Sequence, residues 1–114
     1  ISSVFYYCQC AFFFSPTVCF TVIAANQIKI FLSGGVSTNL APLEMPHFSD
    51  EEILVAVEEA NRRKSYVMAH CHTDEGANRC VDLGVRSIEH GSLIKEKTAK
   101  KIMENKVWTI WLGN

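Results

Sequence analysis

Residues 66–90 read YVMAHCHTDEGANRCVDLGVRSIEH, and they contain a complete strand–helix–strand unit. Residues 66–71 and 85–90 are short, largely apolar runs of the length typical of buried strands. Between them, Thr73 can cap a helix that has Asp74 and Glu75 in its first turn and runs to about Leu83. Gly84 then supplies the residue that commonly ends a helix.

The same alternation continues on both sides of this unit. Residues 27–32 (QIKIFL) predict a strand that ends at Ser33-Gly34-Gly35, and residues 107–112 (VWTIWL) predict another. Ser49 and Glu52 form a capping box that opens a helix over about 50–63, and a third helix is expected over 95–105. Strands separated by helices imply parallel pairing through right-handed crossovers, as in a barrel or a Rossmann-like sheet.

Two of these helices show an apolar face. The helix over 50–63 has Ile53, Val57 and Ala60 on one stripe with Leu54 beside them, and the helix over 95–105 has Ile102 and Met103 as its apolar edge. No G-x-G-x-x-G or Walker A loop follows any predicted strand, so a nucleotide site has no support.

The charged residues are distributed unevenly. The 114 residues carry 11 basic and 12 acidic side chains for a net charge of −1, which gives no footprint for nucleic acid or a membrane surface. Residues 1–28 contain none of these charges. We therefore divide the chain into an apolar, Cys- and Phe-rich segment, 1–25, and a domain, 26–114.

The segment 1–25 leaves three interpretations open. It is a strand-rich piece of a larger fold, a membrane anchor, or sequence foreign to the rest of the chain. Pro16 interrupts its apolar run and no Lys or Arg flanks its N-terminal side, which disfavours the anchor. The 5 cysteines form no Cys-x-x-Cys pair, and their odd number favours a reducing, cytoplasmic location over a disulfide-bonded one.

Polar residues stand at strand positions that are otherwise apolar. Lys29 lies in the first predicted strand, His70 ends the second with His72 just beyond it, and His90 ends the third. Side chains alternate along a strand, so Met68 and His70 share one face, as do Ile88 and His90. If these faces look into a barrel, one lysine and two histidines converge near one mouth, where neutral imidazoles suit zinc.

Three strings in this order resemble consecutive pieces of the metal-dependent amidohydrolase superfamily: IKIFLSGGVST, YVMAHCHT and SIEHG. The most similar subgroup is the imidazolonepropionase-related one, which includes Xaa-Pro dipeptidases (prolidases) and arginine carboxypeptidase-like enzymes. The similarity runs from about Asn26 to Trp111. It implies an α/β fold in which the chain supplies strands 4 to 7 of a (β/α)8 TIM barrel.

The resemblance also implies a site with one or two divalent metal ions, usually zinc. Lys29 matches the lysine that is carboxylated and bridges two ions; a free lysine is a cation and cannot bind metal, whereas its carboxylated form is an anionic oxygen ligand. His70 and His90 match histidine ligands. His72 falls where relatives contact the substrate, with a role in supporting a metal ligand as the alternative.

The implied activity is hydrolysis of an amide or dipeptide-like C–N bond in a small molecule by a metal-activated water. The family also uses a His-x-His pair from its first strand and an aspartate general base from its last. No histidine precedes His47 in this chain and no residue matches that aspartate, so no catalytic residue is assigned. We therefore expect a truncated, inactive piece of a hydrolase. Two alternatives are a metal-free binding or assembly module and a membrane-anchored α/β domain.

Overall fold

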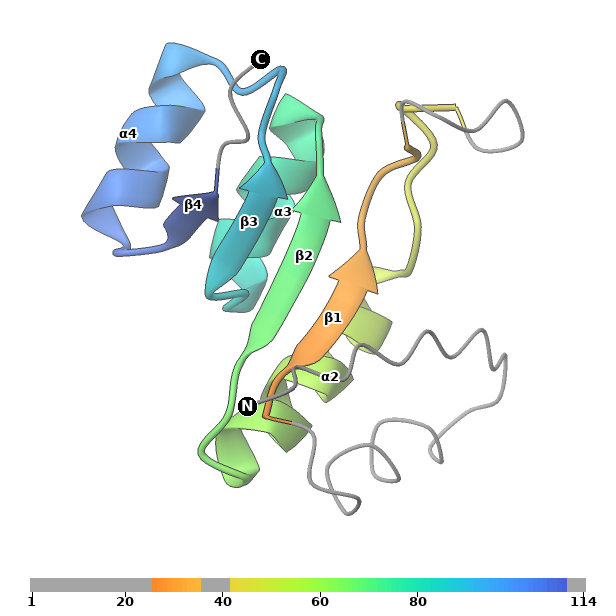
Figure 1. Ribbon diagram of the computed structural model, residues 1–114, viewed down its shortest axis with the longest axis vertical. Coiled ribbons are helices and arrows are strands. Elements are labelled where there is room, and N and C mark those ends of the chain that lie inside the picture. Colours follow the sequence, from red (N-terminus) through yellow and green to blue (C-terminus); the bar gives the residue numbers. More distant parts are fainter. Residues whose placement is uncertain (1–25, 36–41, 111–114) are drawn as a thin grey trace.

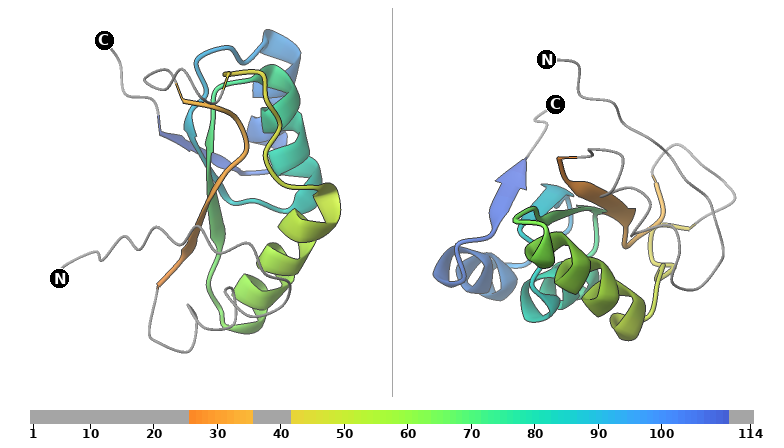
Figure 2. Two further views of the ribbon diagram at one scale, coloured as in Figure 1. Left: turned by 90° about the vertical axis from the view of Figure 1, so that its right-hand side faces the viewer. Right: turned by 90° about the horizontal axis from the view of Figure 1, so that it is seen from below.

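The computed structural model describes residues 26–35 and 42–110, which form one parallel sheet with helices on one of its faces (Figures 1 and 2). The strands are β1 (Ile28–Phe31), β2 (Val67–Cys71), β3 (Ser87–His90) and β4 (Trp108–Ile110), and the helices are α2 (Asp50–Arg62), α3 (Asp74–Leu83) and α4 (Glu96–Glu104). These elements confirm the predicted strand–helix alternation. The segment 1–25 and the end of the predicted fourth strand lie outside the described residues.

The strands follow one another across the sheet in chain order, β1-β2-β3-β4, and every neighbouring pair is parallel. A Rossmann-like sheet reverses its strand order at the point where the ligand binds. The described sheet has no such reversal, which favours the barrel of the two predicted arrangements. Among the described residues, no helix is long and apolar enough to cross a membrane.

The predicted helix caps are present. Ser49 Oγ accepts a hydrogen bond from the Glu52 amide at 3.3 Å, and the Glu52 carboxylate accepts one from the Ser49 amide at 2.7 Å. Thr73 Oγ1 accepts a bond from the Gly76 amide at 3.1 Å, which opens α3 directly after β2. Gly84 ends α3 with a φ of 87°, a left-handed conformation that glycine adopts at no steric cost.

The core lies between the sheet and the helices. Val67 and Ala69 of β2 and Ile88 of β3 are almost fully buried there. The helices pack their apolar residues against these strands: Ile53, Ala56, Val57 and Ala60 from α2, Ala77 and Cys80 from α3, and Ile102 from α4. Burial of this apolar area is the main force that holds the helices on the sheet.

Two predicted apolar contacts are wrong. Leu54 is 47% exposed and Met103 is 77% exposed, although both were expected on the packed helix faces. The reason is geometric: each residue directly follows a buried isoleucine, and neighbouring positions on a helix are about 100° apart around its axis. The packed stripe is narrower than the apolar sequence pattern.

Candidate metal centre

Three histidines from the carboxyl ends of β2 and β3 meet at one place. His70 belongs to β2, His72 follows it, and His90 ends β3; one ring nitrogen from each lies within 4.8 Å of the other two. The ring centroids are 4.6 Å apart for His70 and His90, and 4.8 Å apart for the two pairs that include His72. The parallel order of the sheet produces this meeting because it places the ends of adjacent strands at one edge.

His90 reaches the cluster by an unexpected route. The register pairs Ala69 with Ile88 and His70 with Glu89, so Ile88 faces the helices and Glu89 shares the face of His70. The prediction that Ile88 and His90 point into the barrel together is therefore wrong for Ile88. His90 has a φ of 78°, which interrupts the strand alternation and lets its ring join His70 on the other face.

His70 is held by its neighbours in a defined orientation. Its Nε2 lies 3.3 Å from the carbonyl oxygen of Gly34, and the Phe31 ring lies 4.8 Å from its own. A carbonyl can only accept, so Nε2 carries the proton in this contact and Nδ1 keeps a lone pair. Burial lowers the pKa of His70, which favours the neutral imidazole that a metal requires.

His72 is fixed through both its backbone and its ring. Its amide donates to Ser33 Oγ at 3.0 Å, which joins the turn after β1 to the end of β2. Its Nδ1 lies 3.0 Å from Ser92 Oγ, and its ring stacks on His90 with an interplanar angle of 15°. Burial, with the nearby charge of His90 as a smaller cause, lowers the pKa of His72 as well.

Lys29 lies on the same face of the sheet but ends in an ion pair. Its Nζ contacts a carboxylate oxygen of Glu89, a residue to which the sequence pattern gave no role in the site. The charge of Lys29 contributes to the lowered pKa of His70, so the two side chains are close. Burial lowers the pKa of Lys29 itself. Lys29 and the histidines thus lie on one face of the sheet, as predicted. The direct partner of the Lys29 amine is Glu89.

The donor set suits a divalent metal ion. Zinc and similar transition ions bind the nitrogen of neutral imidazole, and each of these three rings offers one such nitrogen within 4.8 Å of the other two. The contact with Gly34 orients the His70 ring in the way that outer partners orient metal-bound histidines. The three histidines therefore fit a metal centre.

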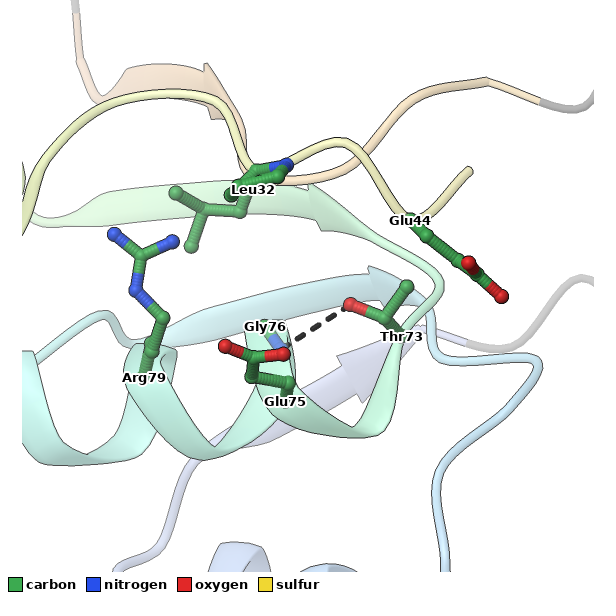
Figure 3. A pocket seen from close by; sticks show the side chains of 7 residues that line it. Leu32, Glu44, Thr73, Glu75, Gly76 and Arg79 are labelled. Atoms are coloured by element: carbon green, nitrogen blue, oxygen red, sulfur yellow. Dashed lines mark hydrogen bonds between the residues drawn. The ribbon is translucent and has the colours of Figure 1, made fainter. Parts of the chain in front are cut away.

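A separate hollow on the helix side of β2 contributes no residue to this cluster. Figure 3 shows Thr73, Gly76 and Arg79 of this hollow together with Leu32 and Glu44. Its volume is about 20 Å³, which accommodates roughly one water molecule. The hollow is too small for an organic substrate.

Comparisons with known proteins identify the family of the chain. The model of the amidohydrolase family matches residues 16–110. The chain belongs to the amidohydrolase family. The match begins at residue 16, which is ten residues before the start at Asn26 that the sequence strings indicate. The domain boundary after residue 25 stays a prediction.

Individual relatives share a third or more of the aligned residues. The chain is 35% identical over 98 residues to ochratoxinase from Aspergillus niger, covering 79% of the chain and 20% of that protein. It superposes with a TM-score of 0.80 and 38% identity on a prolidase solved with N-methylphosphonate-L-proline, covering 83% of the chain and 23% of the prolidase. On a Xaa-Pro dipeptidase solved with methionine in its active site, the chain superposes with a TM-score of 0.69 and 33% identity. The superposition covers 75% of the chain and 21% of the dipeptidase.

The chain therefore spans about a fifth to a quarter of the length of these relatives. Together with the sheet order, the superpositions confirm the predicted fold class: the four strands form part of the (β/α)8 barrel of the amidohydrolases.

Proposed function

We propose that this chain contributes to a metal-dependent hydrolase of amide or dipeptide-like C–N bonds. The observation that carries the proposal is the cluster of His70, His72 and His90 at the carboxyl edge of a parallel sheet in an amidohydrolase chain. Active sites of (β/α)8 barrels lie at this edge.

In this proposal His70 and His90 bind a divalent ion, with zinc as the expected metal, and Lys29 joins them after carboxylation. The neutral state of His70 that its burial favours is the form able to donate a lone pair. The bound ion would supply a water activated near neutral pH and polarise the carbonyl of the substrate.

His72 is assigned to the substrate. Ser92 contacts its Nδ1, and the buried Ser33 hydroxyl holds its backbone, so the ring presents its Nε2 edge in a fixed direction. A fixed donor or acceptor beside the metal would orient the scissile amide. Two relatives support the substrate class: one is named a Xaa-Pro dipeptidase, and a prolidase binds a phosphonate joined to proline, whose tetrahedral phosphorus resembles a carbonyl under attack.

Zinc binding to the purified chain tests the metal assignment directly. A chromogenic chelator competes for zinc with the wild type, with His90→Ala and with His47→Ala, which removes a histidine outside the cluster. We expect His90→Ala to weaken binding by about 100-fold and His47→Ala to leave it unchanged. Equal zinc affinity in all three proteins would refute the proposed centre.

Activity requires the remainder of a barrel, so it is tested in a chimera. Residues 26–110 replace the matching segment of the prolidase that is 38% identical, and hydrolysis of Xaa-Pro dipeptides is measured. We expect the chimera to hydrolyse the dipeptide and its His90→Ala variant to lose both activity and metal. A folded, metal-loaded chimera that is inactive on dipeptides and on other N-acyl amino acids would contradict the assigned reaction.

A further inference from the structure

The ion pair between Lys29 and Glu89 has an unusual position. Lys29 belongs to β1 and Glu89 to β3, and β2 lies between these strands in the sheet. Adjacent strands are about 4.8 Å apart, so the two side chains must reach toward each other over the side chains of β2. His70 is the residue of β2 that lies level with Glu89. The pair therefore crosses the sheet next to the first histidine of the cluster.

This position conflicts with the role proposed for Lys29. As an ammonium group it is attracted to Glu89, and both groups are largely shielded from solvent, at 23% and 19% exposed. An ammonium has no lone pair and cannot bind a metal ion. While the pair is intact, the histidine cluster lacks the contribution of Lys29.

From this arrangement we propose that Glu89 is a positioning residue that holds Lys29 in a state unable to bind metal until carbon dioxide modifies the amine. The inference rests on the proposed function, because it assumes that Lys29 joins the metal centre. It assigns Glu89, to which the sequence pattern gave no role, to control of the assembly of that centre.

The modification changes the sign of the charge on Lys29. The ammonium group and carbon dioxide give a carbamate and two protons: an N–C bond forms, two N–H bonds break, and no atom is oxidised or reduced. The product carries a negative charge next to the Glu89 carboxylate. Attraction becomes repulsion, which favours movement of the lengthened side chain from Glu89 toward the histidines, where a bound cation would stabilise its negative charge.

The same reasoning gives the sign of a mutational effect. Glu89→Gln keeps the shape of the side chain but removes its charge, so the ammonium loses its partner and the carbamate loses its repulsive neighbour. Both changes favour the carbamate. The free energy of an ion pair of this exposure is about that of the stronger surface pairs. If removal of the pair favours the carbamate by this free energy, zinc affinity in bicarbonate should rise about fivefold.

The test measures zinc affinity by chelator competition, with and without bicarbonate, and carbamate formation by NMR with ¹³C-bicarbonate. The wild type is compared with Glu89→Gln, with Lys29→Ala, and with Asp82→Asn, which removes the carboxylate of another ion pair, that with Lys101 on the helix side. Glu89→Ala is a second variant that removes the same charge.

We expect Glu89→Gln and Glu89→Ala to show a stronger carbamate signal and about fivefold tighter zinc binding in bicarbonate, with no gain in its absence. Asp82→Asn should match the wild type, and Lys29→Ala should lose the bicarbonate response. Weaker or unchanged zinc binding in both Glu89 variants would overturn the inference while leaving the histidine centre intact. A wild-type chain that binds no zinc in either buffer would overturn the proposed function as well.

Discussion

Gly76 is the position where a single methyl group should disturb both the fold and the site. It lies in the first turn of α3, and a Cβ placed there would be 2.5 Å from Cys71 Sγ and 2.8 Å from Thr73 Oγ1. Cys71 is completely buried, and Thr73 Oγ1 is the cap that accepts a bond from the Gly76 amide. To avoid the added methyl group, Sγ would have to turn within the packed core and Oγ1 would have to leave the helix cap.

The size of the effect follows from opposing terms. Alanine in place of glycine favours a helix by about 1 kcal/mol. Overpacking of a buried site costs about 1–3 kcal/mol, and loss of the cap costs about 1 kcal/mol more. We therefore expect Gly76→Ala to lower the free energy of unfolding by about 2 kcal/mol and Tm by roughly 8–16 °C. Because Cys71 lies between His70 and His72, zinc binding should weaken too.

Urea unfolding followed by circular dichroism checks this prediction. The matched control is Gly35→Ala, because a Cβ at Gly35 would have nothing within 4 Å; its stability should change by less than about 0.5 kcal/mol. Adding Cys71→Ala to Gly76→Ala removes one of the two clashing atoms and should recover about 1 kcal/mol beyond additivity. A Gly76→Ala chain as stable as the wild type, or one that Cys71→Ala does not rescue, would refute the reasoning.

Three further outcomes are expected. Burial lowers the pKa of His70 and of His72, so the folded chain binds fewer protons than the unfolded one. The urea midpoint of the metal-free chain should therefore fall as pH decreases from about 7 to 5, and a midpoint that rises would contradict the direction of both shifts. Arg79→Ala removes a 2.8 Å hydrogen bond to Asp50 and another to the loop before α2, and should lower the free energy of unfolding in urea by about 1–2 kcal/mol. An unchanged free energy of unfolding would show that these bonds do not stabilise the fold. Ser92→Ala should leave zinc affinity unchanged while raising KM in the chimera, and a loss of affinity would instead identify His72 as a metal ligand.

Most of the fold could be predicted because its local signals agree with one another. Residues 66–90 contain a strand, a cap at Thr73, a helix and a glycine stop at Gly84, and the structure has each of them in place. Parallel pairing followed from the helical crossovers. The exposure of Leu54 and Met103 was not predictable in the same way, because an apolar residue at the margin of a helix face is buried only if a neighbouring element covers it.

The site was predicted in part, and the missing part has one physical origin. The period-2 alternation of a strand assigns Ile88 and His90 to the same face, and thereby removes Glu89 from the site. The left-handed backbone at His90 breaks that period. In the sequence, the signal of an irregular strand end is Gly91, which directly follows His90. Left-handed backbone conformations are common in turns that contain glycine.

The strained backbone at His90 connects the fold to the proposed chemistry. A non-glycine residue at positive φ costs of order 1–3 kcal/mol and persists only where the surrounding structure fixes it. Here the Gly91 amide donates to the Cys71 carbonyl at 3.0 Å, and the Leu93 amide donates to the His72 carbonyl at 2.9 Å. These two bonds attach the chain that follows His90 to the last residue of β2 and to the residue after it. The segments that bear the histidines are thus joined directly to each other, and these bonds hold the backbone positions from which the three rings meet.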